Sequence, residues 1–201
     1  MLVHEDEVGL TVARQSKLID EIRAHMFEFV SRLNVSAVLC VGEGVAKTNT
    51  WIGQCVLHRK LPQSVRTVVL VDLLDRGPGS FFSDPQACLA TQLHIVPLLA
   101  DATALPFPDR LFELTVAPFM VDDCNDHVKL IDELFRCTRK SGKVLIAGHG
   151  LDTAQLVNKS RELLGATHVN QAKPDQIREL ALRGGNHLIH EFLNDHAWVQ
   201  I

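Results

Sequence analysis

Short apolar runs alternate with helix-like stretches along almost the whole chain. An uninterrupted apolar run of about five residues that meets a glycine or an acid is typical of a buried parallel strand. Such runs predict strands at residues 37–41, 68–72, 94–99, 112–117 and 143–147. Two further extended pieces, 188–193 and 197–201, meet around Asn194 and Asp195 and predict an antiparallel pair at the end of the chain.

The segments between these strands carry helix signals. Helical spacing predicts a first amphipathic helix around the apolar residues Leu18, Ile22, Met26, Phe29 and Leu33. Further helices are expected over 46–58, 84–91 and 153–164, from Asn125 or Asp126 to about 141–142, and from Pro174 toward Gly184. The helix that Asn125 or Asp126 begins is expected to turn inward Val128, Ile131, Leu134 and Phe135.

Strands that alternate with helices imply right-handed crossovers and a largely parallel sheet. The sequence therefore predicts an α/β fold with a doubly wound, mostly parallel, Rossmann-like sheet and an antiparallel C-terminal strand pair. The chain of 201 residues has no internal repeat or linker, so a single domain over 1–201 is expected.

The composition argues against several classes of protein. A net charge of −4 and the absence of tyrosine disfavour a nucleic-acid partner, which needs excess cations and stacking rings. No apolar run reaches the ~18 residues of a membrane-spanning helix, and the first residues are acidic where a signal peptide is basic. We therefore expect a cytoplasmic protein without a membrane partner. The five cysteines include no CxxC pair, which predicts neither a disulfide framework nor a cysteine zinc site.

Candidate ligand-binding residues follow several of the predicted strands directly. In doubly wound folds, ligands bind at the carboxyl ends of the strands, near the point where the strand order reverses. The residues at these ends are Gly42, Glu43, Gly44, Asp72, Asp101, Pro118 and His149. We expect a ligand site along this edge of the sheet.

Three classes of nucleotide-like ligand are bound at a glycine turn after a first strand, and the turn at residues 42–44 fits their patterns to different degrees. A phosphate-binding P-loop needs glycines where Val41 and Ala46 stand. A dinucleotide fingerprint fits Gly42 and Gly44, but its third glycine position holds Lys47. Asp72 at the end of the second strand would suit a ribose diol, but this acid alone does not separate a nicotinamide dinucleotide from any other adenosine ligand, and the third class is indicated by the motifs described next.

Four motifs of the chain, in order, resemble the class I S-adenosylmethionine-dependent methyltransferases. Residues 38–46 are similar to the family's first strand and G-x-G turn, and residues 69–72 to its second strand with a ribose-binding acid. Residues 101–113 resemble the D-A-x-x-L-P-F-x-D-x-x-F-D signature of a small-molecule subgroup that includes quinone-biosynthesis enzymes. Residues 133–146 resemble its E-x-x-R-v-L-k-P-G-G-x-l segment.

This resemblance implies S-adenosylmethionine as cofactor and methyl transfer to a small-molecule acceptor. In that family Asp72 would accept bonds from the ribose hydroxyls, Asp101 would bind the adenine amino group, and Ala102 would lie near the ring. The glycines would let the ligand approach the backbone. The full set expected at the cofactor is Val41, Gly42, Glu43, Gly44, Asp72, Leu73, Asp101, Ala102 and Pro118. Residues 1–34 would form a lid, in which His25 and Phe27 contact substrate, or a helix that packs on the core at 35–201.

The chain departs from the family pattern at two positions. Cys40 stands where the family has an acid that helps to hold the cofactor's ammonium group, and Ala46 replaces a third glycine. Two functions therefore stay open: an active methyltransferase, or a methyltransferase-like binding or scaffold protein with a weakened cofactor site.

Other candidate groups have a plain structural interpretation beside the functional one. His149, Asp122 and Asp123 can serve as acid–base groups or as ordinary loop residues. A metal site formed by His187, His190, Glu191 and His196 is disfavoured, because residues three apart on a strand face opposite sides. No G-x-S-x-G turn supports a hydrolase.

Overall fold

The computed structural model describes residues 2–42, 50–73, 93–149, 158, 174–183, 191–193 and 197–200. Within these residues, a seven-stranded sheet has the order β3-β2-β1-β4-β5-β7-β6. Five neighbouring strands pair in parallel: β1 (Ala37–Val41), β2 (Thr67–Asp72), β3 (His94–Leu99), β4 (Phe112–Pro118) and β5 (Thr138–His149). At the far edge β7 (Ala197–Gln200) pairs antiparallel with β5, and β6 (Glu191–Leu193) pairs antiparallel with β7.

The strand order reverses between β1 and β4. The chain first moves outward from β1 to β2 and β3, and then returns to place β4 on the other side of β1. A crevice forms at such a reversal because the two neighbouring connections leave the sheet in opposite directions. The carboxyl ends of β1 and β4 therefore mark the place where a doubly wound fold binds ligands.

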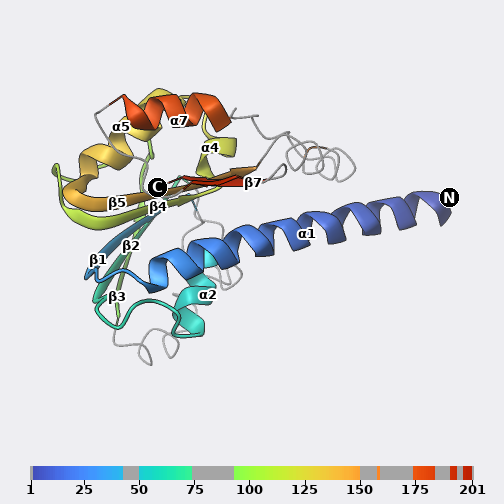
Figure 1. Ribbon diagram of the computed structural model, residues 1–201, viewed down its shortest axis with the longest axis horizontal. Coiled ribbons are helices and arrows are strands. Elements are labelled where there is room, and N and C mark those ends of the chain that lie inside the picture. Colours follow the sequence, from blue (N-terminus) through green and yellow to red (C-terminus); the bar gives the residue numbers. More distant parts are fainter. Residues whose placement is uncertain are drawn as a thin grey trace.

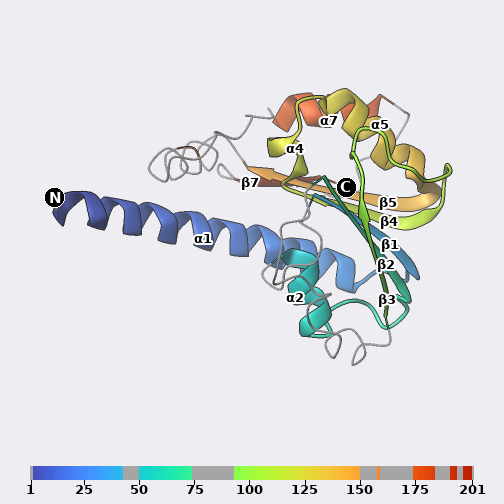
Figure 2. The same ribbon diagram turned by 180° about the vertical axis from the view of Figure 1, so that it is seen from behind.

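Helices cover both faces of the sheet (Figures 1 and 2). The helices α1 (Leu2–Ser31) and α2 (Trp51–Leu57) lie on one face, and α4 (Met120–Asp123), α5 (His127–Cys137) and α7 (Pro174–Leu182) lie on the other. Alternate residues of β1 belong to different buried clusters: Val38 and Cys40 pack with α1 and α2, whereas Leu39 and Val41 pack with α5 and α7. These apolar residues are buried on both sides, which explains why the strand is a continuous apolar run.

The second half of the long helix α1 packs on the sheet. Ile22, Met26 and Val30 recur every four residues and are at most 2% exposed. Fully burying a side chain of this size contributes about 1.5–3 kcal/mol. The first half of α1 projects beyond the sheet (Figure 1). Leu33, which was expected in this helix, lies after its end.

The start of α5 is as predicted, but its inward face and its end are different. Asp126 caps the helix by accepting a bond from the Lys129 amide at 3.1 Å. Val128 is 45% exposed, so its predicted inward position is wrong; Leu130 and Cys137 are buried instead. The expectation that the helix reaches residues 141–142 is also wrong, because it ends at Cys137.

Thr138 explains this early end. Its hydroxyl bonds to the Leu134 carbonyl at 2.7 Å and to the Thr115 hydroxyl at 2.6 Å, deep between α5 and β4. Thr138 is therefore the first residue of β5, and it pairs with Phe112. The register then shifts before the pairing of Lys143 with Leu114, so residues 139–142 bulge from the ladder.

Several predicted elements lie partly or wholly outside the described residues. The helices expected at 84–91 and 153–164 lie outside the described residues, apart from Asn158. Residues 46–49, the start of the helix expected over 46–58, also lie outside them, and the later part of that helix is α2. One described helix, α4, was not predicted. It begins after Phe119, whose backbone has the left-handed conformation at φ 57°.

Candidate functional site

Gly42 forms the turn at the carboxyl end of β1. Its φ is +85°, a conformation that side-chain-bearing residues rarely adopt, and its amide donates to the Val71 carbonyl of β2 at 2.8 Å. The Met120 side chain of α4 packs directly against it. A Cβ at Gly42 would overlap Met120 Sδ and lie 3.0 Å from Met120 Cβ and Cγ. Both the backbone angle and the space therefore require glycine.

Asp72 ends the neighbouring strand β2, one residue beyond the pairing of Val71 with Val41. Only 8% of it is exposed. Its carbonyl accepts a bond from the Ala100 amide at 3.0 Å, which ties this strand end to the start of the loop after β3. Leu73 follows with 59% exposure. A carboxylate and an apolar side chain thus lie next to the Gly42 turn.

The loop at residues 101–110 connects β3 to β4 and carries Asp101 and Ala102. Asp101 Oδ1 accepts bonds from the Thr103 amide and hydroxyl, both at 2.8 Å, and the amide bond chiefly holds the pKa of Asp101 below its usual value. Asp101 is exposed, whereas Ala102 is 4% exposed and packs in the cluster beneath α5. The loop therefore begins with an ionised carboxylate beside a buried methyl group.

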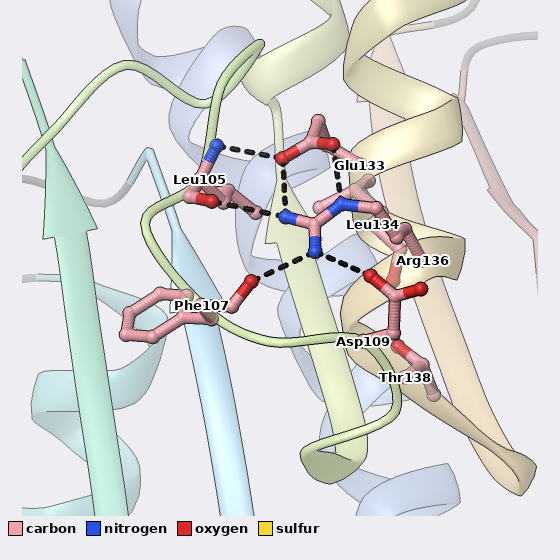
Figure 3. Close-up of polar contacts among 7 residues, drawn as sticks. All are labelled: Leu105, Phe107, Asp109, Glu133, Leu134, Arg136 and Thr138. Atoms are coloured by element: carbon pink, nitrogen blue, oxygen red, sulfur yellow. Dashed lines mark hydrogen bonds and ion pairs between the residues drawn. The ribbon is translucent and has the colours of Figure 1, made fainter.

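An ion-pair cluster on α5 holds the same loop (Figure 3). Arg136 donates to Glu133 Oε1 at 2.6 Å and Oε2 at 2.8 Å, to the carbonyls of Leu105 at 2.9 Å and Phe107 at 2.7 Å, and to Asp109 at 2.8 Å. Glu133 also accepts from the Leu105 amide at 2.7 Å. The hydrogen bonds from Arg136 hold the pKa of Glu133 below its usual value. Both backbone groups of Leu105 are therefore bound by side chains of α5.

The residues of this cluster belong to two motifs that are visible in the sequence, but the sequence does not show that the two motifs contact each other. Glu133 and Arg136 are the charged residues of the E-x-x-R motif, and the loop is the D-A-x-x-L-P-F-x-D motif. The structure brings these two motifs together into one cluster. The spacing of three places Glu133 and Arg136 on one face of α5, which a helical pattern can predict. Their partners are 27 to 31 residues away in the chain, which no local pattern predicts.

The segment after β4 supplies the opposite side of the site. Pro118 is buried and ends the strand, and the Phe119 amide donates to the Ala147 carbonyl at 2.7 Å. Of the two candidate acid–base residues on α4, Asp122 is 1% exposed and Asp123 is exposed. His127 Nε2 donates to the Val121 carbonyl at 2.8 Å, and so links the start of α5 to α4.

The structure thus gathers most of the predicted site residues at one edge of the sheet. Val41 and Gly42, Asp72 and Leu73, Asp101 and Ala102, and Pro118 follow the ends of adjacent strands β1 to β4. Glu43 and Gly44 lie outside the described residues, as do His187, His190 and His196 of the metal pattern. His149 ends β5 and pairs with Ala197. Among the described residues, no group of His, Cys, Asp or Glu has the arrangement of a metal site.

Cys40 lies below this edge. It is 1% exposed and belongs to the cluster formed with α1 and α2. The position where the family has an acid therefore carries a thiol among apolar side chains.

A separate hollow of about 420 Å³ lies between α1 and α2. Lys60 lies over the Phe27 ring at 5.1 Å from its centroid, and the Trp51 indole donates to the Arg23 carbonyl at 3.2 Å. Its lining residues are Asp20, Arg23, Ala24, Phe27, Trp51, Gln54, Cys55 and Lys60. It contains none of the residues predicted at the cofactor, so Phe27 lies in a different place from the strand ends.

A family model described as a methyltransferase domain matches residues 52–146. This stretch contains Asp72, the 101–110 loop and the Glu133–Arg136 pair. This part of the chain is therefore similar to a methyltransferase domain, in agreement with the class I S-adenosylmethionine-dependent methyltransferase motifs of the sequence.

One curated relative and two solved structures are similar to this chain. The chain is 25% identical over 170 residues to a demethylmenaquinone methyltransferase of Mycobacterium sp. (strain KMS), covering 85% of this chain and 68% of the relative. It shares its fold with the PH0226 protein from Pyrococcus horikoshii OT3, with a TM-score of 0.65, 14% identity, and coverage of 92% and 88% of the two chains. A SAM-dependent methyltransferase from Aquifex aeolicus matches with a TM-score of 0.58, 12% identity, and coverage of 94% and 95%. No helix among the described residues is long and apolar enough to cross a membrane.

Proposed function

We propose that this protein transfers the methyl group of S-adenosylmethionine to a small-molecule acceptor at the edge formed by β1 to β4. One observation carries the proposal: the nearly buried carboxylate of Asp72 lies at the end of β2, beside the positive-φ turn of Gly42 at the reversal of the strand order. A carboxylate there can accept both hydroxyls of a ribose, and charge-assisted bonds of this kind are the stronger ones.

The donor set at this edge fits the cofactor. Asp72 is an acceptor for the ribose diol, and Asp101 is an ionised acceptor for the adenine amino group. Ala102 follows Asp101 and would lie near the ring with its methyl group buried beneath α5, while Leu73 supplies an exposed apolar contact. We assign Val41, Gly42 and Pro118 to the walls of the site, and extend it to Glu43 and Gly44 from the sequence motif.

The bound cofactor supplies an electrophilic methyl group on a sulfonium. The task of the protein is then to align the acceptor with that methyl group and to exclude water, which is where most of the rate enhancement of such a displacement arises. Met120 and Phe119 lie where the segment after β4 meets Gly42, so they are suited to bound the space on the acceptor side. A direct displacement of this kind requires no covalent bond between a protein residue and the methyl group.

A small, apolar acceptor is supported by the curated relatives, whose name specifies demethylmenaquinone. The net charge of −4 argues against nucleic acid as the acceptor. We also propose that the chain is one domain, because Ile22, Met26 and Val30 of α1 share a cluster with Val38 of β1. This packing favours a structural role for the second half of α1 over that of a lid.

The second candidate function is a binding or scaffold protein with a weakened cofactor site. The observation that favours it is Cys40, whose buried thiol supplies no charge to an ammonium group. The two candidates differ in affinity for the cofactor. An active enzyme binds S-adenosylhomocysteine, the product of the transfer, whereas the scaffold shows no heat of binding.

Isothermal titration calorimetry with S-adenosylhomocysteine tests the proposal through Asp72→Ala. We expect the wild type to bind and the variant to lose about 100-fold in affinity, because two bonds to a charged acceptor contribute about 3 kcal/mol together. Asp132→Ala is the matched control, since Asp132 is an exposed carboxylate on α5. Equal binding by Asp72→Ala and the wild type would contradict the assignment of Asp72. A folded wild type that shows no heat of binding would favour the scaffold.

A further inference from the structure

The loop at residues 101–110 contains no helix or strand, yet it carries two of the proposed adenine contacts. Within the loop, the backbone supplies two short-range bonds, from Ala104 to Asp101 at 3.0 Å and from Phe107 to Leu105 at 2.9 Å. A loop of this length has many accessible conformations, and fixing each backbone residue costs about 1–2 kcal/mol. The Thr103 bonds to Asp101 hold only the first residues of the loop, so contacts from outside are needed to select the conformation of the rest.

The Arg136 side chain provides that selection. Its guanidinium donates to three loop residues that are not adjacent: the carbonyls of Leu105 and Phe107 and the carboxylate of Asp109. A planar guanidinium offers five donors in fixed directions, so it specifies where these three acceptors lie. An ammonium group cannot reproduce this pattern, because it is a compact point charge at the end of a flexible stem.

Glu133 completes the arrangement from the preceding turn of α5. It holds Arg136 through two bonds and accepts the Leu105 amide. The two side chains have 17% (Glu133) and 30% (Arg136) exposure, so solvent screens them only in part. The main chain of α5 adds one more bond, from the Arg110 amide to the Arg136 carbonyl at 2.8 Å.

We propose that Arg136, held by Glu133, is a positioning residue for the cofactor: it fixes the loop so that Asp101 and Ala102 meet the adenine end. This inference rests on the proposed function, because it uses those two residues as adenine contacts. Leu105 lies three residues after Ala102 and is itself 5% exposed, so its fixed backbone limits where the start of the loop can lie.

The test compares Arg136→Met with Arg139→Met. Arg139 is the matched control, since it also forms an ion pair, with Glu113 at 2.7 Å, but makes none of the bonds to the loop. Calorimetry with S-adenosylhomocysteine and with adenosine is done well below the Tm of each variant. For Arg136→Met we expect Kd to rise about 10- to 100-fold for both ligands, as for a loop that is binding-competent in about 1–10% of molecules. Arg139→Met is expected to stay within about twofold.

Hydrogen exchange gives a second measurement that needs no ligand. The amides of residues 102–105 and of Phe107 are expected to exchange faster in Arg136→Met than in the wild type, and at an unchanged rate in Arg139→Met. Should Arg136→Met not fold, Arg136→Lys is measured instead; it keeps the charge, loses the fork, and is expected to bind between the wild type and the methionine variant.

A double variant separates positioning from stability. Glu133→Leu with Arg136→Met removes both partly buried charges of the pair and leaves only Asp109, which is 70% exposed, without its partner, so stability is expected to recover in part. The Kd is expected to stay raised, because the loop bonds are still missing. Recovery of Kd together with stability would overturn the inference, as would unchanged Kd in a folded Arg136→Met. If the wild type itself fails to bind, the proposed function falls first and this inference falls with it.

Discussion

The two sides of the candidate site are built on different physical principles. At the β1 turn, Gly42 is fixed by shape: its backbone angle and the Met120 side chain leave no room for a Cβ. In the loop at 101–110, position is fixed by charge and hydrogen bonds, which converge from Glu133 and Arg136. A steric constraint tolerates almost no substitution but is insensitive to pH, whereas a polar one responds to both charge and pH.

The largest expected effect is that of Gly42→Ala. The added Cβ clashes with Met120, at about 1–3 kcal/mol, and the left-handed backbone angle costs about 1–2 kcal/mol more. The free energy of unfolding, measured by urea denaturation, should fall by about 2–5 kcal/mol. Adding Met120→Ala should return only the part of the clash that comes from Met120 Sδ and Cγ, because alanine keeps the Cβ. An unfolding free energy within about 0.5 kcal/mol of the wild type would show that the turn is not sterically fixed.

An intermediate and pH-dependent effect is expected for Glu133→Gln. Arg136 lowers the pKa of Glu133 in the folded state, so the folded protein holds fewer protons here than the unfolded chain. The stabilisation is complete above the unfolded pKa of about 4.3 and is lost as the pH falls through the lower folded value. The variant should be about 1–3 kcal/mol less stable than the wild type at pH 7. This difference should shrink below about pH 4.5 in urea denaturation at several pH values.

Glu113→Gln is the control for that experiment. Glu113 accepts bonds from Ser36 and Ala37 and from Arg139, and the Ser36 amide chiefly holds its pKa below the usual value. The free energy of unfolding of this variant should follow the same trend with pH, but hydrogen exchange at the amides of residues 102–105 and of Phe107 should not change. Faster exchange there in Glu113→Gln would mean that the loop responds to general loss of stability.

The smallest expected effect is that of Thr103→Val. It removes the hydroxyl bond to Asp101 and leaves the amide bond. The pKa of Asp101 should therefore rise toward its ordinary value without reaching it, as measured by NMR titration of the carboxyl carbon. The loss of unfolding free energy should be about 0.5 kcal/mol, because the bond is exposed. An unchanged pKa would show that this hydroxyl does not contribute to the start of the loop.

The sequence predicted the regular elements well where local signals were strong. The bounds of β1 and β3 coincide with the predicted runs at 37–41 and 94–99, and Asp126 is the cap of α5. The prediction of elements from the sequence was wrong where tertiary contacts compete with a local pattern. Thr138 leaves the helical pattern because its hydroxyl bonds to Thr115 on β4, and Val128 is exposed although its spacing favoured burial.

The residues of the candidate site also divide into those that local sequence predicts and those that it does not. Gly42, Asp72 and Asp101 were predictable, because each lies at or shortly after the end of a strand that the apolar pattern marks. The roles of Met120 and Arg136 were not, since their partners Gly42 and Leu105 lie far away in the chain. No window of local sequence contains both members of such a pair.

The amino-acid sequence by itself determined which segments are strands and helices and which chemical groups stand at the strand ends. Backbone sterics and apolar patterning act over a few residues, so they can be read locally. The tertiary structure alone decided that Met120 closes on Gly42 and that Arg136 fixes the 101–110 loop. Those contacts depend on how α4 and α5 pack across the sheet, and packing is a property of the whole folded chain.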